Sequence, residues 1–427
     1  MKPFLRLLLA WPLSCGPLLP AADPEPQPPQ PIHLTLVDDQ AIGFATFQSH
    51  NQKAVKNQHG IFMTYVQQSN DDYSAQKWRL MRSTDDGRSF TEVMAETRAT
   101  SAPAIETARD GSIFFARPDF KDGNAYLSRL DAPQDNPTTT TLTGGAAGKY
   151  CMLLDQPRGQ LYYFAHNGTF HIAALDNQGV ETTQPLIHGE IAYLQYPHLT
   201  LARDGTLFAA WTTSHRDRYL YRSIHAMKSI DGGQTWQTLA GEPLALPIPA
   251  DDTGPATRIS RDDELDVHSW LSACMAKDGK LHLVYWAKTT PQRQRYVRYD
   301  AATGELEADR LDLFPERSMD QPNDSGVLVA DRSVPHSTLY FVSTIDDRKR
   351  LACVASDDNG LTWREHAVSD RLFDHRVYSI GGARDVTGDG WIIGSFTDTP
   401  ENAETYYEPD SGDVYFFRFR SADRPAR

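Results

Sequence analysis

Three short polar stretches of this chain carry side chains that could transfer protons near neutral pH. His50 lies in QSHNQK, His166 lies in FAHNGTF, and Tyr196 opens YPHLTL. Histidine changes its protonation state near neutral pH, and a positioned tyrosine can also donate or accept a proton. Arginine side chains follow related segments and could hold an anionic group. These residue types predict general acid–base chemistry on an acidic substrate.

The apolar segments beside these stretches form a repeat. A short apolar strand, a turn and an aromatic-rich strand recur seven times, at a spacing of about 50 residues over most of the chain. Strand-like segments of this length predict paired β-strands, and helical periodicity is almost absent. The sequence therefore predicts an all-β fold. The seven copies are 54–66, 104–116, 151–165, 199–211, 272–286, 327–342 and 382–396.

A second motif, S-x-D-x-G-x-[ST]-[WF], marks hairpin turns. It occurs at 83–90, 229–236 and 356–363, each time after an alternating strand. Asp, Gly and Asn set such a turn, and the aromatic residue closes over the hairpin. The motif resembles the Asp-box of sialidase-like β-propellers. This resemblance implies a seven-bladed propeller with four strands in each blade, in which the Asp-box turns are structural.

The N-terminal part of the chain is expected to close this ring. DVYFFRFR (413–420) is predicted as the third strand of the last blade, and IHLTLV (32–37) as its outer strand. We expect a signal peptide over residues 1–22, a proline-rich tether over 23–31 and a single propeller over 32–427.

The propeller topology predicts where a site lies. The Asp-boxes and the turns after the innermost strands share one face, so the opposite face, where the innermost strands begin, should carry function. His50, His166 and Tyr196 are the expected catalytic residues. Any of these polar residues could instead plug the channel. The expected substrate-binding residues are Asn51, Gln52, Arg117, Tyr150, Asn167, His198, His215, Arg216, Arg218, His268, Arg293 and Tyr378.

Side-chain alternation gives the opening stretch a specific geometry. If QSHNQK begins an innermost strand, His50 and Gln52 share one side, and Asn51 and Lys53 share the other. We therefore expect His50 and Gln52 to face the cavity together.

The run 196–248 and the stretch SHNQKAV resemble the BNR-repeat group that contains ulvan-lyase-type polysaccharide lyases and related propellers that cleave rhamnose–glucuronate linkages. In those lyases a His and a Tyr exchange protons while an Arg neutralises the uronate carboxylate, and Tyr196 matches that Tyr. Thr212 occupies the slot of the Arg, so Arg216 or Arg218 is the candidate replacement. His50 matches the first-blade His of the rhamnosidase-like relatives. The resemblance implies cleavage of an acidic glycan, by a lyase or a hydrolase.

The composition and the N-terminal segment indicate which binding partners and which cellular compartment to expect. A net charge of −14 argues against nucleic acid, because phosphate binding needs a basic surface. Lys2 and Arg6 before a short apolar run are typical of a signal peptide, which predicts a secreted or periplasmic protein, and Cys15 makes a poor lipid-anchor signal. We expect a monomer without a membrane span, a metal or another cofactor. Cys151, Cys274 and Cys353 lie in apolar runs and are expected in the core.

Three other functions remain open. The same fold could bind glycans without catalysis, or serve as a scaffold for protein interactions. A sialidase would need an arginine triad, a Tyr–Glu pair and an R-I-P type motif before the first Asp-box, and residues 32–82 contain no such motif.

Overall fold

The computed structural model describes residues 28–48, 50–68, 76–133, 136–176, 179–189, 192–215, 220–250, 256–260, 268–287, 293–311, 313–314, 326–333, 338–400 and 408–422. Within these ranges the chain forms strands and turns, and it has no helix that could cross a membrane. The expected signal peptide and Cys15 lie outside the described residues.

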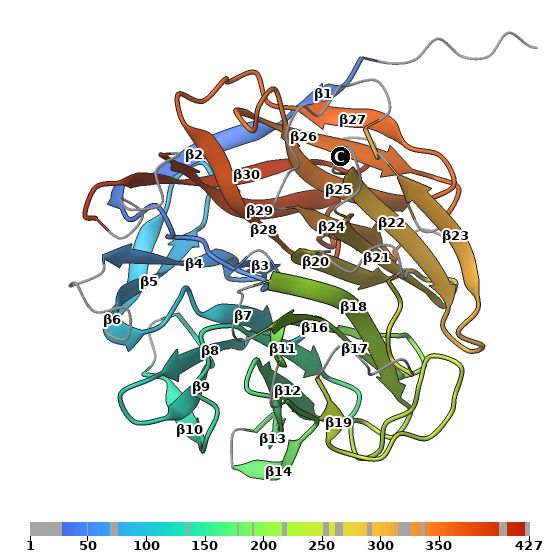
Figure 1. The fold of residues 1–427 in the computed structure, drawn as a ribbon. Coiled ribbons are helices and arrows are strands. Elements are labelled where there is room, and N and C mark those ends of the chain that lie inside the picture. The colour runs from blue at the N-terminus through green and yellow to red at the C-terminus, as the bar shows by residue number, and fades with distance from the viewer. Residues whose placement is uncertain are drawn as a thin grey trace, which may run out of the picture.

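Seven blade sheets stand around a central axis, as the repeat predicted (Figure 1). The innermost strand of each sheet lies near the axis and pairs antiparallel with the next strand outward. The chain is therefore a seven-bladed β-propeller. The innermost strands are β3 (Ala54–Asn57), β7 (Ala104–Thr107), β11 (Tyr150–Asp155), β16 (Ala192–Leu201), β20 (His268–Met275), β24 (Val327–Asp331) and β28 (Arg376–Gly382).

The remaining strands continue each blade outward. The second strands are β4 (Gly60–Gln68), β8 (Ile113–Asp119), β12 (Gln160–Ala165), β17 (Leu207–His215), β21 (Lys280–Ala287), β25 (Thr338–Ile345) and β29 (Trp391–Thr399). The third strands are β5 (Gln76–Ser83), β9 (Asn124–Leu130), β13 (Thr169–Ala174), β18 (Leu220–Ser229), β22 (Arg293–Asp300), β26 (Arg350–Ser356) and β30 (Gly412–Arg420). The outer strands are β6 (Thr91–Ala99), β10 (Thr138–Leu142), β14 (Val180–Pro185), β23 (Leu306–Leu311), β27 (Arg364–Val368) and β2 (His33–Ala41).

The N-terminal strand β2 supplies the outer strand of the last blade, as the sequence predicted. It pairs antiparallel with β30, and Leu34 lies opposite Phe417. The short strand β1 (Gln30–Pro31) pairs parallel with β27 of the preceding blade. These two residues fall within the stretch expected to be a tether, so the chain packs against the propeller before residue 32.

Among the described residues, the fourth blade departs from the predicted four strands, since its sheet contains β16, β17 and β18, and Arg258 forms only an isolated bridge with His225 of β18. After the Asp-box, the chain forms isolated bridges at Gln237 and the short strand β19 (Ile248–Pro249), which pairs with β15 (Ile187–His188). Proline has no N–H to donate to a strand ladder. Pro243, Pro247 and Pro249 therefore disfavour a long regular strand directly after the Asp-box.

The Asp-boxes are hydrogen-bonded turns. The Asp85 carboxylate accepts the backbone N–H groups of Arg88 and Ser89 at 3.0 Å each, and Asp231 and Asp358 cap their turns in the same way. Arg158, in the β11–β12 turn, donates to the Gly205 carbonyl of the next inner turn and to the Ile230 carbonyl of an Asp-box. Inner turns and Asp-boxes thus share one face, the turn face. The opposite face is called the mouth face.

The core lies between neighbouring blades, and Cys151, Cys274 and Cys353 are buried free thiols within it, as expected. Phe417 is fully buried among aromatic residues where the ring closes. We expect Phe417→Ala to lower the free energy of unfolding by about 3–5 kcal/mol, because it leaves a cavity. Leu36→Ala, on the closing strand, is the control, since Leu36 is 48% exposed and should cost less than about 0.5 kcal/mol. Chemical denaturation gives both values, and equal losses would contradict this view of the closure.

Candidate functional site

The segment that carries His50 is a turn rather than a strand. Strand β3 begins only at Ala54, and the described residues just before it have no strand pairing. His50 bonds through Nε2 to the Tyr150 carbonyl at 3.0 Å, whereas Gln52 donates to Glu106 at 2.9 Å. The prediction that His50 and Gln52 face one cavity together is therefore wrong. Alternation holds only for extended chain, so the turn sends the two side chains to different partners.

His50 is a neutral imidazole with one free nitrogen. A carbonyl oxygen only accepts, so Nε2 carries the proton and Nδ1 holds a lone pair. Nδ1 is buried and has no hydrogen-bond partner among the described residues. Burial, and then the nearby charge of Lys53, holds the pKa of His50 well below its usual value. His50 therefore stays uncharged at pH 7.

Tyr196 lies edge-on against His50, with ring centroids 5.4 Å apart. Its hydroxyl oxygen is 3.3 Å from that of Tyr221 on β18. The pairing of β16 with β17 shifts register between Gln195 and His198, and Tyr196 has a φ of 48°. Such bulges re-aim a side chain, and a positive φ is uncommon for residues other than glycine. The irregularity of β16 thus places Tyr196 at this contact.

Lys149 joins this contact, and the sequence analysis did not single it out. Its Nζ lies 4.3 Å from the centre of the Tyr196 ring and 3.5 Å from the Tyr221 hydroxyl, and it donates to Gln195. No acidic side chain among the described residues pairs with it. Burial lowers the pKa of Lys149 to about 7. The signal that could have found it is its place directly before Tyr150, where an innermost strand begins.

His166 also belongs to this group. Its backbone N–H bonds to the Lys149 carbonyl at 2.9 Å, and its Nδ1 accepts the Lys149 backbone N–H at 3.5 Å. Burial, with the charge of Lys149 second, lowers the pKa of His166 to about 4. We call these five residues, His50, Lys149, His166, Tyr196 and Tyr221, the mouth cluster. The structure thus places His50 against Tyr196, and it links His166 to this pair through the backbone of Lys149.

Several predicted binding residues have structural partners instead. The Tyr150 hydroxyl is fully buried and bonded to the Ala102 carbonyl at 3.0 Å, so the Tyr150 side chain packs between the second and third blades, and its backbone carbonyl holds His50. His198 is buried, its Nε2 accepts a backbone N–H at 3.4 Å, and burial lowers its pKa to about 4. The buried Asn51 amide donates to Gln48 at 3.5 Å.

Other predicted residues have side-chain partners outside the mouth cluster. Arg117 bonds to the Arg98 carbonyl at 2.8 Å, and its side chain covers Tyr126 in the second blade. Asn167 bonds to the Gly144 carbonyl at 3.0 Å, and Tyr378 packs against Phe44 in the last blade.

The remaining predicted residues lie at the ends of strands or outside the described residues. His215 ends β17. His268 begins β20 and Arg293 begins β22, but their side chains are outside the described part. Arg216 and Arg218 are outside the described residues altogether.

Two further observations limit which chemical groups are available for a reaction at the mouth face. Thr212, in the slot of the expected Arg, is buried and donates to the Ser223 carbonyl at 3.0 Å. Among the described residues, no three His, Cys, Asp or Glu side chains come together as metal ligands. The groups available at the mouth face are therefore a cation, two phenols and two neutral imidazoles.

Comparison with known proteins places the chain in a family. The sequence profile described as "BNR repeat-containing family member" matches residues 53–312, more than half of the 427 residues. The chain belongs to the BNR repeat family. No curated protein sequence matches this BNR repeat protein.

Solved structures share the fold of this BNR repeat protein. An ulvan lyase, described as a new family of polysaccharide lyase, superposes with a TM-score of 0.64 at 12% identity, covering 89% of this chain and 94% of the lyase. The structure of such an ulvan lyase bound to -[GlcA(1-4)Rha3S]- gives 0.63 at 12% identity, with the same coverage. Another polysaccharide lyase gives 0.59 at 11% identity, covering 91% of this chain and 99% of the lyase. At identities this low, the superpositions show a shared fold and nothing about the reaction. The chemistry therefore has to follow from this chain's own residues.

Proposed function

We propose that this BNR repeat protein cleaves a uronate-containing glycan at the mouth cluster. The observation that carries the proposal is Lys149, a partly exposed cation without an acidic partner among the described residues, in contact with two tyrosine rings. A partly desolvated cation attracts an anion far more strongly than one in water. A uronate carboxylate supplies that anion, and the propellers of similar fold include lyases of acidic glycans.

The mouth cluster suits β-elimination. Removal of the proton at C5 of the uronate, next to the carboxylate, leaves negative charge that a cation must stabilise. Lys149 neutralises the carboxylate, and Tyr196, ionised to the phenolate, takes the C5 proton with help from the neighbouring Tyr221 hydroxyl. The C5–H bond breaks, a C4–C5 double bond forms, and the C4–O bond to the leaving sugar breaks. The leaving oxygen then receives a proton from Tyr196.

Lys149 takes the role that the sequence analysis gave to an arginine. Thr212 is buried and hydrogen-bonded, so it leaves the family position without a cation. Lys149 comes from the third blade and reaches the same tyrosine from the other side of the blade boundary. The neutral His50, edge-on to Tyr196, keeps the ring in place and offers Nδ1 as a proton acceptor.

Glycan binding without cleavage is the second candidate function. The burial of His50 and Tyr196 favours it, because a buried side chain is hard for a substrate to reach. His50 and Tyr196 are each only 3% exposed, whereas Lys149 and His166 are partly exposed. A substrate that meets only Lys149 and His166 would be bound and not cleaved.

A single assay separates these functions. The full chain is incubated with ulvan, gum arabic and other acidic polysaccharides, and both ultraviolet absorbance of unsaturated uronate and new reducing ends are followed. Absorbance supports the lyase, and reducing ends alone indicate a hydrolase. Retardation in an affinity gel without either product indicates binding only. A chain that neither cleaves nor binds any of these glycans contradicts the proposal.

Substrate binding should weaken as pH rises through about 7. Lys149 is cationic below its lowered pKa of about 7 and neutral above it, so its attraction for a carboxylate is lost on the alkaline side. The carboxylate itself stays ionised throughout this range. We therefore expect KM for the acidic glycan to rise from pH 6 to pH 8. A KM that stays constant from pH 6 to pH 8 would show that Lys149 does not hold the carboxylate.

A further inference from the structure

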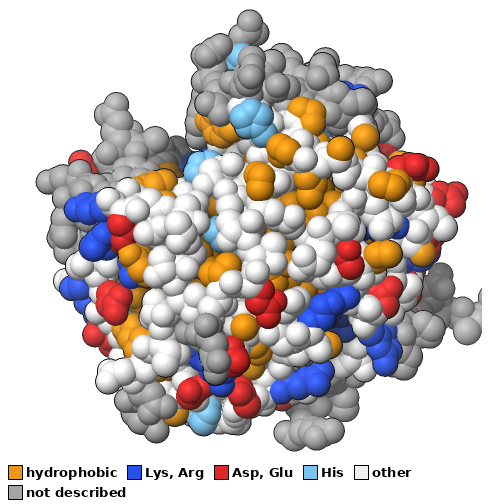
Figure 2. Space-filling view, turned by 90° about the horizontal axis from the view of Figure 1, so that it is seen from below, with side chains coloured by type: hydrophobic (Ala, Val, Ile, Leu, Met, Phe, Trp, Pro, Cys, Tyr) orange, Lys and Arg blue, Asp and Glu red, His pale blue; other side chains and the backbone are white. Residues whose placement is uncertain are grey.

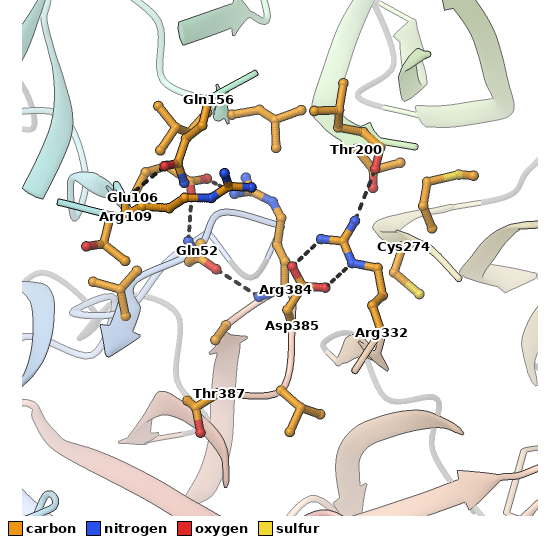
Figure 3. A pocket seen from close by; sticks show the side chains of 18 of the residues that line it. Gln52, Glu106, Arg109, Gln156, Thr200, Cys274, Arg332, Arg384, Asp385 and Thr387 are labelled. Atoms are coloured by element: carbon orange, nitrogen blue, oxygen red, sulfur yellow. Dashed lines mark hydrogen bonds and ion pairs between the residues drawn. The ribbon is translucent and has the colours of Figure 1, made fainter. Parts of the chain in front are cut away.

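A separate pocket of about 490 Å³, drawn in Figure 3, lies on the turn face, because the ends of the innermost strands and the turns after them line it. We call it the turn-face pocket. All seven blades line it, because the innermost strands end around it. Gln52 comes from the first blade, Glu106 from the second, Gln156 from the third, Thr200 from the fourth, Cys274 from the fifth, Arg332 from the sixth and Arg384 from the last.

The pocket contains more positive charge than its acidic side chains neutralise. Arg384 pairs with Glu106, and Arg332 pairs with Asp385. Lys56, also in the lining, pairs with Asp86 at 2.9 Å and Asp389 at 2.7 Å. The two other basic residues of the lining, Arg109 and Arg203, have side chains without an ion pair or hydrogen bond to any described residue. Two guanidinium groups thus remain uncompensated.

This excess contrasts with the rest of the protein. The chain has a net charge of −14. One side of the molecule, in Figure 2, shows Asp and Glu side chains interspersed with Lys and Arg. A concave site lined by charges of one sign raises the local concentration of ions of the opposite sign. The turn-face pocket therefore favours an anion although the protein as a whole repels one.

Arg109 and Arg384 make this a built site. The Arg109 backbone N–H donates to the Gln156 side chain at 2.8 Å, which fixes the start of the Arg109 side chain. Arg384 donates to the Met152 carbonyl at 2.5 Å, while its Nε is buried without a partner among the described residues. Figure 3 shows Arg109 and Arg384 extending toward one another. An anion here would be attracted by Arg109, which has no acidic partner among the described residues, whereas Arg384 already pairs with Glu106.

The size and lining of the pocket indicate more than a bare ion. Its volume is within the range of small-molecule sites, which is about 300–1,000 Å³. Amide and hydroxyl groups of Gln52, Gln156 and Thr200 could bond to hydroxyl groups of a ligand. Apolar side chains such as Leu153 and Met275 could cover a ring face. A sugar ring that carries one acidic group matches this lining.

We infer that the turn-face pocket binds a sugar bearing a single oxyanion group, held by Arg109, Arg203 and Arg384. Both a uronate carboxylate and a sugar sulfate present this group to guanidinium donors. The inference does not depend on cleavage at the mouth cluster.

Calorimetric titration of the full chain tests this inference. The probes are glucuronate, glucose 6-sulfate, inorganic sulfate and glucose. We expect glucuronate or glucose 6-sulfate to bind, the tighter of the two identifying the acidic group, and glucose to bind at least about 10-fold more weakly. Arg109→Gln and Arg203→Gln should each weaken binding at least about 5-fold, in line with loss of a charge-assisted hydrogen bond. Arg88→Gln, an exposed arginine in a turn-face Asp-box, should leave it unchanged.

Several results would overturn the inference. Equal binding of inorganic sulfate would indicate an adventitious ion only, and equal binding of glucose would remove the role of charge. No binding of either acidic sugar would also exclude the site. Lys149→Met separates this site from the mouth cluster, since it should leave turn-face binding unchanged. If Lys149→Met abolishes binding while Arg109→Gln does not, the acidic sugar binds at the mouth face instead.

Discussion

Replacing Lys149 by methionine should reduce the rate of glycan cleavage at least about 100-fold. Methionine keeps much of the volume of the side chain but removes the cation that contacts Tyr196 and Tyr221. Loss of one group that stabilises developing negative charge costs about 100- to 1,000-fold in kcat. The measurement is the initial rate of unsaturated uronate formation or of new reducing ends, compared with Lys121→Met, in which an exposed lysine is replaced.

The same variant should be more stable than the parent, and the difference should depend on pH. The pKa of Lys149 is about 7 in the folded chain and about 10.4 when unfolded, so the unfolded chain binds more protons between these values. The stability of the parent therefore rises with pH from about 7 to 10. Lys149→Met should exceed the parent most below pH 7, and this advantage should shrink toward pH 10.

Denaturation at pH 6 and pH 9 checks this part of the prediction. A variant that loses activity and stability together at pH 6 would indicate that Lys149 is structural. A variant that is stable and retains full turnover would show that the cluster does not need this cation.

Replacing Tyr196 by phenylalanine should also cost at least about 100-fold in rate, the low end for general acid–base catalysis. Only the hydroxyl group is removed, so the edge contact with His50 and the contact with Lys149 remain. Tyr221→Phe is the matched control, because it removes the other hydroxyl of the pair. We expect a smaller loss for Tyr221→Phe, since Tyr221 assists Tyr196 rather than exchanging the substrate proton.

Two histidine variants decide which imidazole takes part. His50→Ala should fold and lose at least about 100-fold in rate if its free Nδ1 assists Tyr196. His166→Ala is the companion, because His166 is the more exposed imidazole next to Lys149. Full turnover in His50→Ala together with lost activity in His166→Ala would make QSHNQK structural and would move the reaction to the His166 side of Lys149.

The repeat pattern determined most of the fold. Seven copies of the strand–turn–strand unit predicted seven blades because one blade cannot bury its faces alone and must stack on its neighbours. The Asp-box spacing predicted the turns at Asp85, Asp231 and Asp358, since a short hairpin depends on local residues only. The fourth blade shows the limit of the pattern, because its described residues form three strands and only isolated bridges beyond them.

The candidate site was predicted only in part. His50 and Tyr196 were selected because residues at the start of innermost strands must meet near the axis, whereas His166 lies in the loop that follows β12. The start of an innermost strand also selected Tyr150, whose hydroxyl is used by the backbone. Gln52 was misplaced, because hydrogen bonds to a neighbouring blade and to Arg384 hold a turn that alternation cannot describe.

Type and spacing of residues thus determined, from the sequence alone, the propeller, its two faces and the kind of side chain at the mouth. The contacts between blades were decided only by the tertiary structure. Lys149 comes from the third blade, and its two tyrosine neighbours come from the fourth. The charge excess of the turn-face pocket likewise depends on which arginine finds an acidic partner in another blade. Groups far apart along the chain decide which side chains are buried and which are paired. Burial in turn lowers the pKa of Lys149, and the lack of an acidic partner leaves the charge of Arg109 uncompensated.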